Sequence, residues 1–188
     1  MEDPFDFRAL RVRQPRKLLP DRANYEIFNA DRQLLATATE TEGHARLKLP
    51  GRSVPDTRVF ALATAAGEPV GSLIKQSSEW ITEFRGPGGE LIGRIRTGAT
   101  RRIYTLLGDQ DQMVGKVTGD LALKHFSVTG PEGVVVAWVR KTWAGLTKEM
   151  LTPSDHYALE FTGLVSQPAR TLTVMTPIVV DLTLYEPV

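Results

Sequence analysis

Cysteine is absent from the 188 residues of this chain, and its absence excludes several kinds of chemistry at once. The protein can form no disulfide, no thiolate metal site and no cysteine nucleophile, and it can carry no S-palmitoyl anchor. The residues after Met1 also lack the hydrophobic run of a secretory signal, so we expect a cytoplasmic location.

The chain also lacks a large net charge of either sign. The chain has 23 Lys and Arg residues against 22 Asp and Glu residues, which gives a formal net charge of +1. A nearly neutral chain has no general attraction for polyanions, so nucleic acid is not an expected partner. The length fits one globular domain, which we expect to span residues 1–188.

The motifs of common enzymes are missing as well. The chain contains no G-x-S-x-G, H-E-x-x-H, Walker A or G-x-G-x-x-G sequence. His44, His125 and His156 are far apart and are interpreted as ordinary surface or strand residues. Asp109-Gln110-Asp111 begins like a calcium loop, but the later ligands of such a loop are missing, so we interpret it as a hairpin turn. We therefore predict a protein that is not an enzyme and has no cofactor.

A repeat of 22 residues runs through the middle of the chain. In each copy a turn is followed by apolar residues, one small residue and further apolar residues. The small residues are Gly71, Gly93, Gly115 and Ala137. This period fits one turn and two antiparallel strands, so each copy predicts a hairpin, with the small residue at a bend or a close contact. An earlier copy, D-R-Q-L-L-A-T-A, is out of phase because of an insertion around Pro50.

Alternating apolar residues predict about a dozen strands in all. A first strand would carry Phe5, Phe7, Leu10 and Val12. Strands are also predicted at Tyr25–Phe28, Leu34–Thr39, Ala45–Leu49, Val59–Thr64, Trp80–Arg85, Arg102–Leu107, Lys124–Thr129, Val134–Lys141 and Tyr157–Thr162.

The most apolar stretch runs from Pro168 to Glu186. Its many β-branched residues and the apolar side chains at alternate positions favour a strand, and Pro177 would kink a helix. Wound as a helix, the same stretch would be apolar on every side, which is typical of a helix in a protein core or a membrane. The local pattern alone therefore predicts a strand.

The chain from Val139 onward resembles the phospholipid scramblase family. The stretch V-R-K-T-W-A-G-L-T-K-E-M-L-T-P-S-D-H-Y-A-L-E-F is similar to that family's K-x-W-G-G … R-E-x-L-T-D-A-D-x-F-x-[IL]-x-F. The matching residues are Lys141, Trp143, Gly145, Glu149, Leu151, Thr152, Asp155, Leu159 and Phe161. Asp181 and Glu186 fall on the Asp and Glu of the family's final L-I-D-x-x-F-F-E, and Arg170 falls on a basic position. The wider group includes the Tubby domain and the plant LURP-one-related proteins.

This resemblance implies an all-β fold, a Tubby-like closed antiparallel barrel of about 12 strands around a C-terminal apolar helix. We therefore expect Pro168 to Glu186 to be helical, since tertiary context can override a weak local propensity. Such a helix would be roughly 28 Å long, just enough to cross a bilayer. Asp181 and Arg170 would each cost about 2.5–3.5 kcal/mol near the bilayer centre, so we expect a core helix.

The resemblance also bears on calcium. The family's proposed calcium segment corresponds to Thr152 to Ser166, and Asp155 is the only carboxylate retained there. Calcium takes six to eight oxygen ligands, so we predict no tight calcium site in this segment and no other metal site. Mature eukaryotic scramblases are generally described with a cysteine-linked lipid and a Pro-rich N-terminal arm, and this chain has neither.

Basic residues are the remaining feature of the sequence that indicates a function. The candidates for binding lipid headgroups are Arg94, Arg96, Arg101 and Arg102, and a single acid, Glu90, lies in the same repeat. Arginine binds phosphate bidentately, and each basic residue contributes about 1 kcal/mol at an anionic membrane. A solvated strand face is the alternative interpretation, and Trp80, Trp138 and Trp143 are interpreted as core or rim packing.

The sequence thus favours a non-enzymatic scramblase-like domain that binds anionic phospholipid at a membrane surface. The alternative is a soluble barrel that binds a protein or a small ligand and has no membrane role. Neither a protein partner nor an oligomeric state is indicated. Tubby domains bind phosphoinositides through basic residues, but none of those positions can be matched here, so that support is an analogy of fold.

Overall fold

A computed structural model of the protein describes residues 4–15, 23–42, 57–76, 80–143 and 155–184. Within these residues the chain forms twelve strands and one helix. The strands are β1 Ala9–Arg13, β2 Asn24–Asn29, β3 Leu34–Glu42, β4 Thr57–Thr64, β5 Pro69–Gln76, β6 Ile81–Arg85, β7 Leu91–Thr97, β8 Ile103–Gly108, β9 Met113–Gly119, β10 His125–Thr129, β11 Val135–Trp143 and β12 Asp155–Phe161. The helix is α1, Ala169–Leu184.

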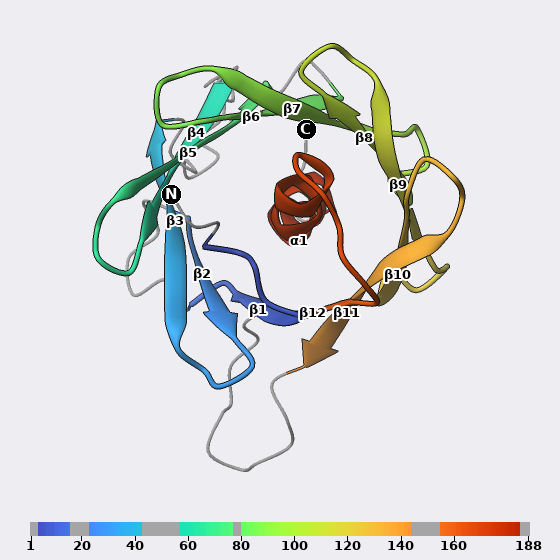
Figure 1. Ribbon diagram of the computed structural model, residues 1–188, viewed down its shortest axis with the longest axis horizontal. Helices are drawn as coiled ribbons and strands as arrows, with labels where there is room; N and C mark the ends of the chain where they lie inside the picture. Colours follow the sequence, from blue (N-terminus) through green and yellow to red (C-terminus); the bar gives the residue numbers. More distant parts are fainter. Residues whose placement is uncertain (1–3, 16–22, 43–56, 77–79, 144–154, 185–188) are drawn as a thin grey trace, which may run out of the picture.

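The strands form a closed antiparallel barrel around α1 (Figure 1). Each strand pairs with its neighbours in the sequence, and β12 pairs with β1 to close the ring. The fold implied by the resemblance is therefore confirmed. The expected first strand was wrong in its start, because β1 begins at Ala9 and Phe5 is instead buried in the core. The strand predicted at Ala45–Leu49 lies outside the described residues.

The helix fills the lumen of the barrel, and its residues 170–183 are all buried. Helix prevails over the local strand pattern because a strand at the centre of a barrel has no neighbour to receive its backbone hydrogen bonds, whereas a helix makes these bonds internally. The threonine hydroxyls bond in the same way, each to the carbonyl four residues earlier. These bonds come from Thr173, Thr176 and Thr183, at 2.7, 2.9 and 2.6 Å.

Both charged residues of the helix have partners inside the protein. Asp181 accepts a 2.8 Å hydrogen bond from the hydroxyl of Tyr25, and burial together with this carboxylate raises the pKa of Tyr25. Arg170 donates from Nε to the carbonyl of Phe5 and from Nη2 to the carbonyl of Phe7, at 2.9 and 2.6 Å. These contacts fit a core helix, as expected. Among the described residues no helix has the length and apolar character needed to cross a bilayer.

The repeat seen in the sequence is a bulged hairpin that occurs five times. In each hairpin one extra residue stands directly before the small residue, where the strand register shifts, and its side chain packs against the core. The extra residues are Leu35, Val70, Ile92, Val114 and Val136. A β-bulge bends its strand and increases the local twist, so one bulge per hairpin helps the sheet curve into a closed ring.

The small residues also allow close contacts, which agrees with the prediction from the spacing. A Cβ atom at Gly93 would lie 2.5 Å from the carbonyl oxygen of Leu107 and 2.9 Å from Cδ1 of Leu172 on the helix. Gly93 therefore lets α1 approach the wall of the barrel at β7.

We predict that Gly93→Ala destabilises the protein by about 1–3 kcal/mol, the usual cost of overpacking. The added methyl group collides with the backbone of β8 and with the helix, and neither can move freely. Urea denaturation followed by far-UV circular dichroism measures the change. Gly163→Ala is the matched control, because a Cβ atom there meets nothing within 4 Å. Equal stability of the two variants would contradict the close packing at Gly93.

Candidate functional site

The antiparallel order places the turns alternately at the two ends of the barrel. We call the end where α1 begins the N-end, and it carries the turns of the five bulged hairpins. We call the end where α1 finishes the C-end, and it carries the turns from β7 to β8 and from β9 to β10. Two of the four predicted arginines, Arg101 and Arg102, lie in the first of these turns.

At the C-end, Arg101 links the barrel wall to the helix. Its Nη1 atom donates a 3.4 Å hydrogen bond to the carbonyl of Thr183, and its guanidinium carbon lies 5.5 Å from the ring centre of Trp80. Lys75 donates to the neighbouring carbonyl of Leu182 at 3.5 Å. Cations at the last carbonyls of a helix stabilise its C-terminus. Burial lowers the pKa of Lys75, and repulsion from Arg58 and Arg101 lowers it further.

The next turn continues this surface. The amide of Gly119 donates to the carbonyl of Arg102 at 2.7 Å, which places Arg102 and Ile103 beside the turn from β9 to β10. That turn carries Leu121, whose side chain is 87% exposed, and Lys124.

A continuous surface at the C-end therefore mixes cationic and exposed apolar side chains. We call it the basic rim and define it as Lys75, Trp80, Arg96, Arg101, Arg102, Ile103, Leu121 and Lys124. An acid in this surface, Asp120, accepts hydrogen bonds from the Lys124 amide at 2.9 Å and from the His125 ring at 3.0 Å. These bonds hold the pKa of Asp120 below its usual range.

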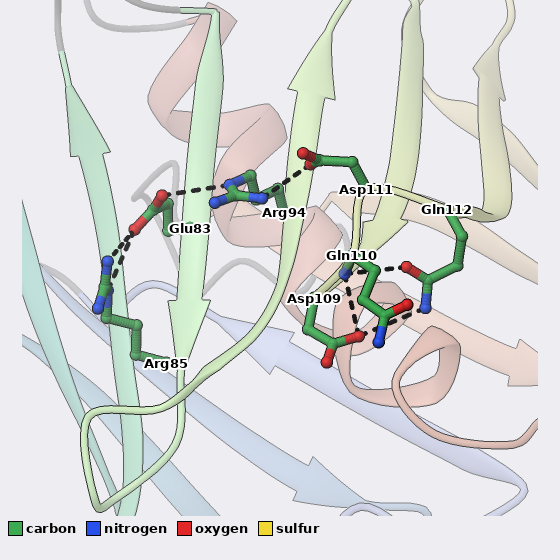
Figure 2. Close-up of polar contacts among 7 residues, drawn as sticks. All are labelled: Glu83, Arg85, Arg94, Asp109, Gln110, Asp111 and Gln112. Carbon is green, nitrogen blue, oxygen red and sulfur yellow. Dashed lines mark hydrogen bonds and ion pairs between the residues drawn. The ribbon is translucent and has the colours of Figure 1, made fainter.

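The other two predicted arginines share the outer face of β7 but differ in their surroundings. Arg94 donates to Glu83 on β6 at 3.2 Å and to Asp111 in the turn from β8 to β9 at 2.7 Å (Figure 2). Arg96 is exposed, lies opposite Ile81 in the sheet, and forms no ion pair with a described residue. Two carboxylates thus compensate the charge of Arg94, whereas no carboxylate among the described residues pairs with Arg96.

Glu83 is the acid that sequence reasoning missed. It also accepts hydrogen bonds from Arg85, at 2.8 and 3.1 Å, so it stands between two arginines (Figure 2). Partial burial by itself would raise the pKa of Glu83, but the hydrogen bonds from Arg85 and Arg94 outweigh it and lower the pKa. The strand pattern could have revealed this pair, because Glu83 stands directly opposite Arg94 in a hairpin with this register.

Asp109, Gln110 and Asp111 form a hairpin turn, as the sequence interpretation had it (Figure 2). Gln112 closes the turn, accepting from the amide of Gln110 at 3.0 Å. Nowhere in the described ranges do three or more His, Asp or Glu side chains gather to hold a metal ion. The backbone of Asp155 belongs to β12, while its side chain and the preceding residues 144–154 lie outside the described part.

We predict that Glu83 contributes stability that is lost in acid. Its pKa is lowered in the folded protein, so its contribution is present above the ordinary value of 4.5 and disappears as pH falls through the lower folded value. The midpoint of urea unfolding for the wild type should exceed that of Glu83→Gln at pH 7, and this difference should shrink at pH 3. Glu132→Gln, at an exposed turn, should give no such pH-dependent difference. A difference that is constant across pH would contradict the ion pairs.

Comparison with known proteins places this barrel in a family. The family model described as Scramblase matches residues 72–187, starting in β5 and so well before the resemblance noted from Val139. A crystal structure of a protein from Arabidopsis thaliana is similar in fold, with a TM-score of 0.56, 14% sequence identity and coverage of 96% of each chain. No curated protein matches the chain. Because the family model matches more than half of its length, the chain belongs to the Scramblase family.

Proposed function

We propose that this protein is a non-enzymatic scramblase-family domain that binds anionic lipid headgroups at a membrane surface through the basic rim. The observation that carries the proposal is the mixture of cationic and exposed apolar side chains on one continuous end of the barrel. Membership of the Scramblase family supports a lipid-related role in general.

The basic side chains of the rim supply the attraction for phosphate. Arginine binds phosphate oxygens through two parallel N–H bonds, and lysine acts as a compact point charge. Each cation near an anionic bilayer contributes about 1 kcal/mol. Arg96, Arg101 and Arg102 are the main headgroup ligands in this proposal, and Arg94 contributes less because Glu83 and Asp111 already compensate its charge.

The apolar side chains of the rim supply a shallow insertion. Trp80, Ile103 and Leu121 are 48%, 37% and 87% exposed, and all three lie among the cations. Tryptophan favours the interface between water and hydrocarbon, because its ring is apolar and its N–H is polar. Together they direct the C-end toward the bilayer.

We predict that replacing Arg96, Arg101 and Arg102 together by alanine weakens binding to anionic vesicles roughly 100-fold, from about 1 kcal/mol for each charge. Co-sedimentation with vesicles of phosphatidylserine and phosphatidylcholine measures the loss, and high salt should weaken wild-type binding in the same direction.

Arg94→Ala is the matched control, and it should weaken binding less than Arg96→Ala on the same strand. Melting curves of all variants check the fold, because Arg101 also bonds the end of the helix. Wild-type protein that binds neither anionic nor neutral vesicles would overturn the proposed function.

We also predict an asymmetry between the two ends of the barrel. Leu121→Asp at the C-end should weaken vesicle binding at least tenfold, because it replaces an inserted apolar group by a charge that anionic lipid repels. Leu164→Asp should have little effect, since Leu164 is fully exposed at the N-end. Equal losses in the two variants would contradict docking by the basic rim.

A further inference from the structure

A cavity lies at the N-end of the barrel, whereas the basic rim lies at the C-end. A barrel of about twelve strands is wider than one helix, and α1 packs against β7, β8 and β1. Beside the start of the helix lies a cavity of about 390 Å³. Its lining comes from the N-terminal segment, the first turn of α1 and the two hairpins β4–β5 and β6–β7.

The inner wall of this cavity is apolar. Phe5 and Phe84 form its buried base, with 1% and 3% of their surfaces exposed. Val70 and Ile92, the bulge residues of the two adjacent hairpins, form its sides. The volume lies within the 300–1,000 Å³ typical of small-molecule sites, which are mostly apolar with a few polar groups.

The mouth of the cavity is acidic. Glu68 lines it directly. The carboxylate of Glu90 lies against Gly86, another lining residue, because a Cβ atom at Gly86 would be 2.0 Å from Oε1 of Glu90. Neither carboxylate forms an ion pair with a residue in the described part of the chain. Two carboxylates at the mouth of an apolar cavity, with no described cation paired to either, complement a ligand with one cationic end.

The surrounding turns strengthen this preference. The N-end turns carry a majority of acids, so fatty acids and other apolar anions are repelled from the mouth. The acids in these turns are Asp31, Glu68, Glu90, Asp109, Asp111 and Glu132, of which Asp111 is paired with Arg94. Arg32 is the basic residue in the same set of turns.

We propose that this cavity binds a hydrophobic cation, with its alkyl or aryl group against Phe84, Val70 and Ile92 and its ammonium group between Glu68 and Glu90. The site is separate from the basic rim, since the two occupy opposite ends of the barrel. Binding of such a ligand therefore does not depend on the proposed membrane role.

The test compares three probes of equal chain length on the full chain: octylammonium, octanol and octanoate, each below its micelle concentration. Methyl resonances of Val70 and Ile92 report occupancy of the cavity, and calorimetry gives the affinity. We expect octylammonium to bind about tenfold more tightly than octanol, from the charge-assisted contacts at the mouth, and octanoate to bind most weakly.

Two variants locate the site. Glu68→Gln combined with Glu90→Gln should remove the preference for octylammonium over octanol, while both still bind. Ile92→Trp should fill the cavity and abolish binding of all three, and the glutamine variant decides the question if Ile92→Trp fails to fold. Octanoate binding as tightly as octylammonium, an unchanged preference in the glutamine variant, or no shift of the Val70 and Ile92 methyl groups would each overturn the proposal. Vesicle binding by the glutamine variant should equal that of the wild type, which separates this site from the basic rim.

Discussion

The barrel depends on a central helix that forms its backbone hydrogen bonds within itself. A strand in the lumen would have no neighbouring strand to bond with. The lumen of a closed barrel of this size must be filled, and the segment that fills it should not bring unpaired backbone N–H and C=O groups into the core. α1 fills the lumen, because its residues 170–183 are buried. Between the helix ends, its backbone groups bond within the helix except at Pro177, which has no N–H to donate, and the hydroxyls of Thr173, Thr176 and Thr183 bond back to helix carbonyls. Each buried aliphatic side chain adds about 1.5–3 kcal/mol of hydrophobic stabilisation.

The helix also organises the two ends of the molecule. At its start, Arg170 holds the carbonyls of Phe5 and Phe7, so the N-terminal segment becomes part of one mouth of the barrel. At its finish, the carbonyls of Leu182 and Thr183 gather Lys75 and Arg101. The negative end of the helix dipole and its orphan carbonyls thus collect cations at one end, while the hairpin turns leave acids at the other.

The sequence predicted the parts of this structure that arise from local periodicity. The 22-residue spacing of Gly71, Gly93 and Gly115 gave the hairpins, and the resemblance gave the closed barrel. Local pattern could not give α1, because its β-branched residues suit a strand and the choice of helix follows from the absence of neighbours in the lumen.

The residues of the candidate site also differ in how far the sequence could predict their positions. Arg101 and Arg102 could be placed at a turn from their position in the repeat. The ion pairs of Arg94 follow only once the strand register is known, because Glu83 belongs to the preceding strand and Asp111 to the following turn. Leu121 and Lys124 were missed because they come from the next repeat and reach Arg102 only through the pairing of β8 with β9.

The position of α1 after all twelve strands has a consequence for how the protein folds. Hairpins between sequence neighbours form from short-range contacts, but the pairing of β1 with β12 joins the two ends of the sheet across most of the chain. The inward apolar side chains of the sheet pack against α1, which follows the strands in the sequence. In a nascent chain these side chains therefore have no helix to pack against until α1 has left the ribosome. Complete burial, and with it resistance to aggregation, therefore comes only after translation of the helix.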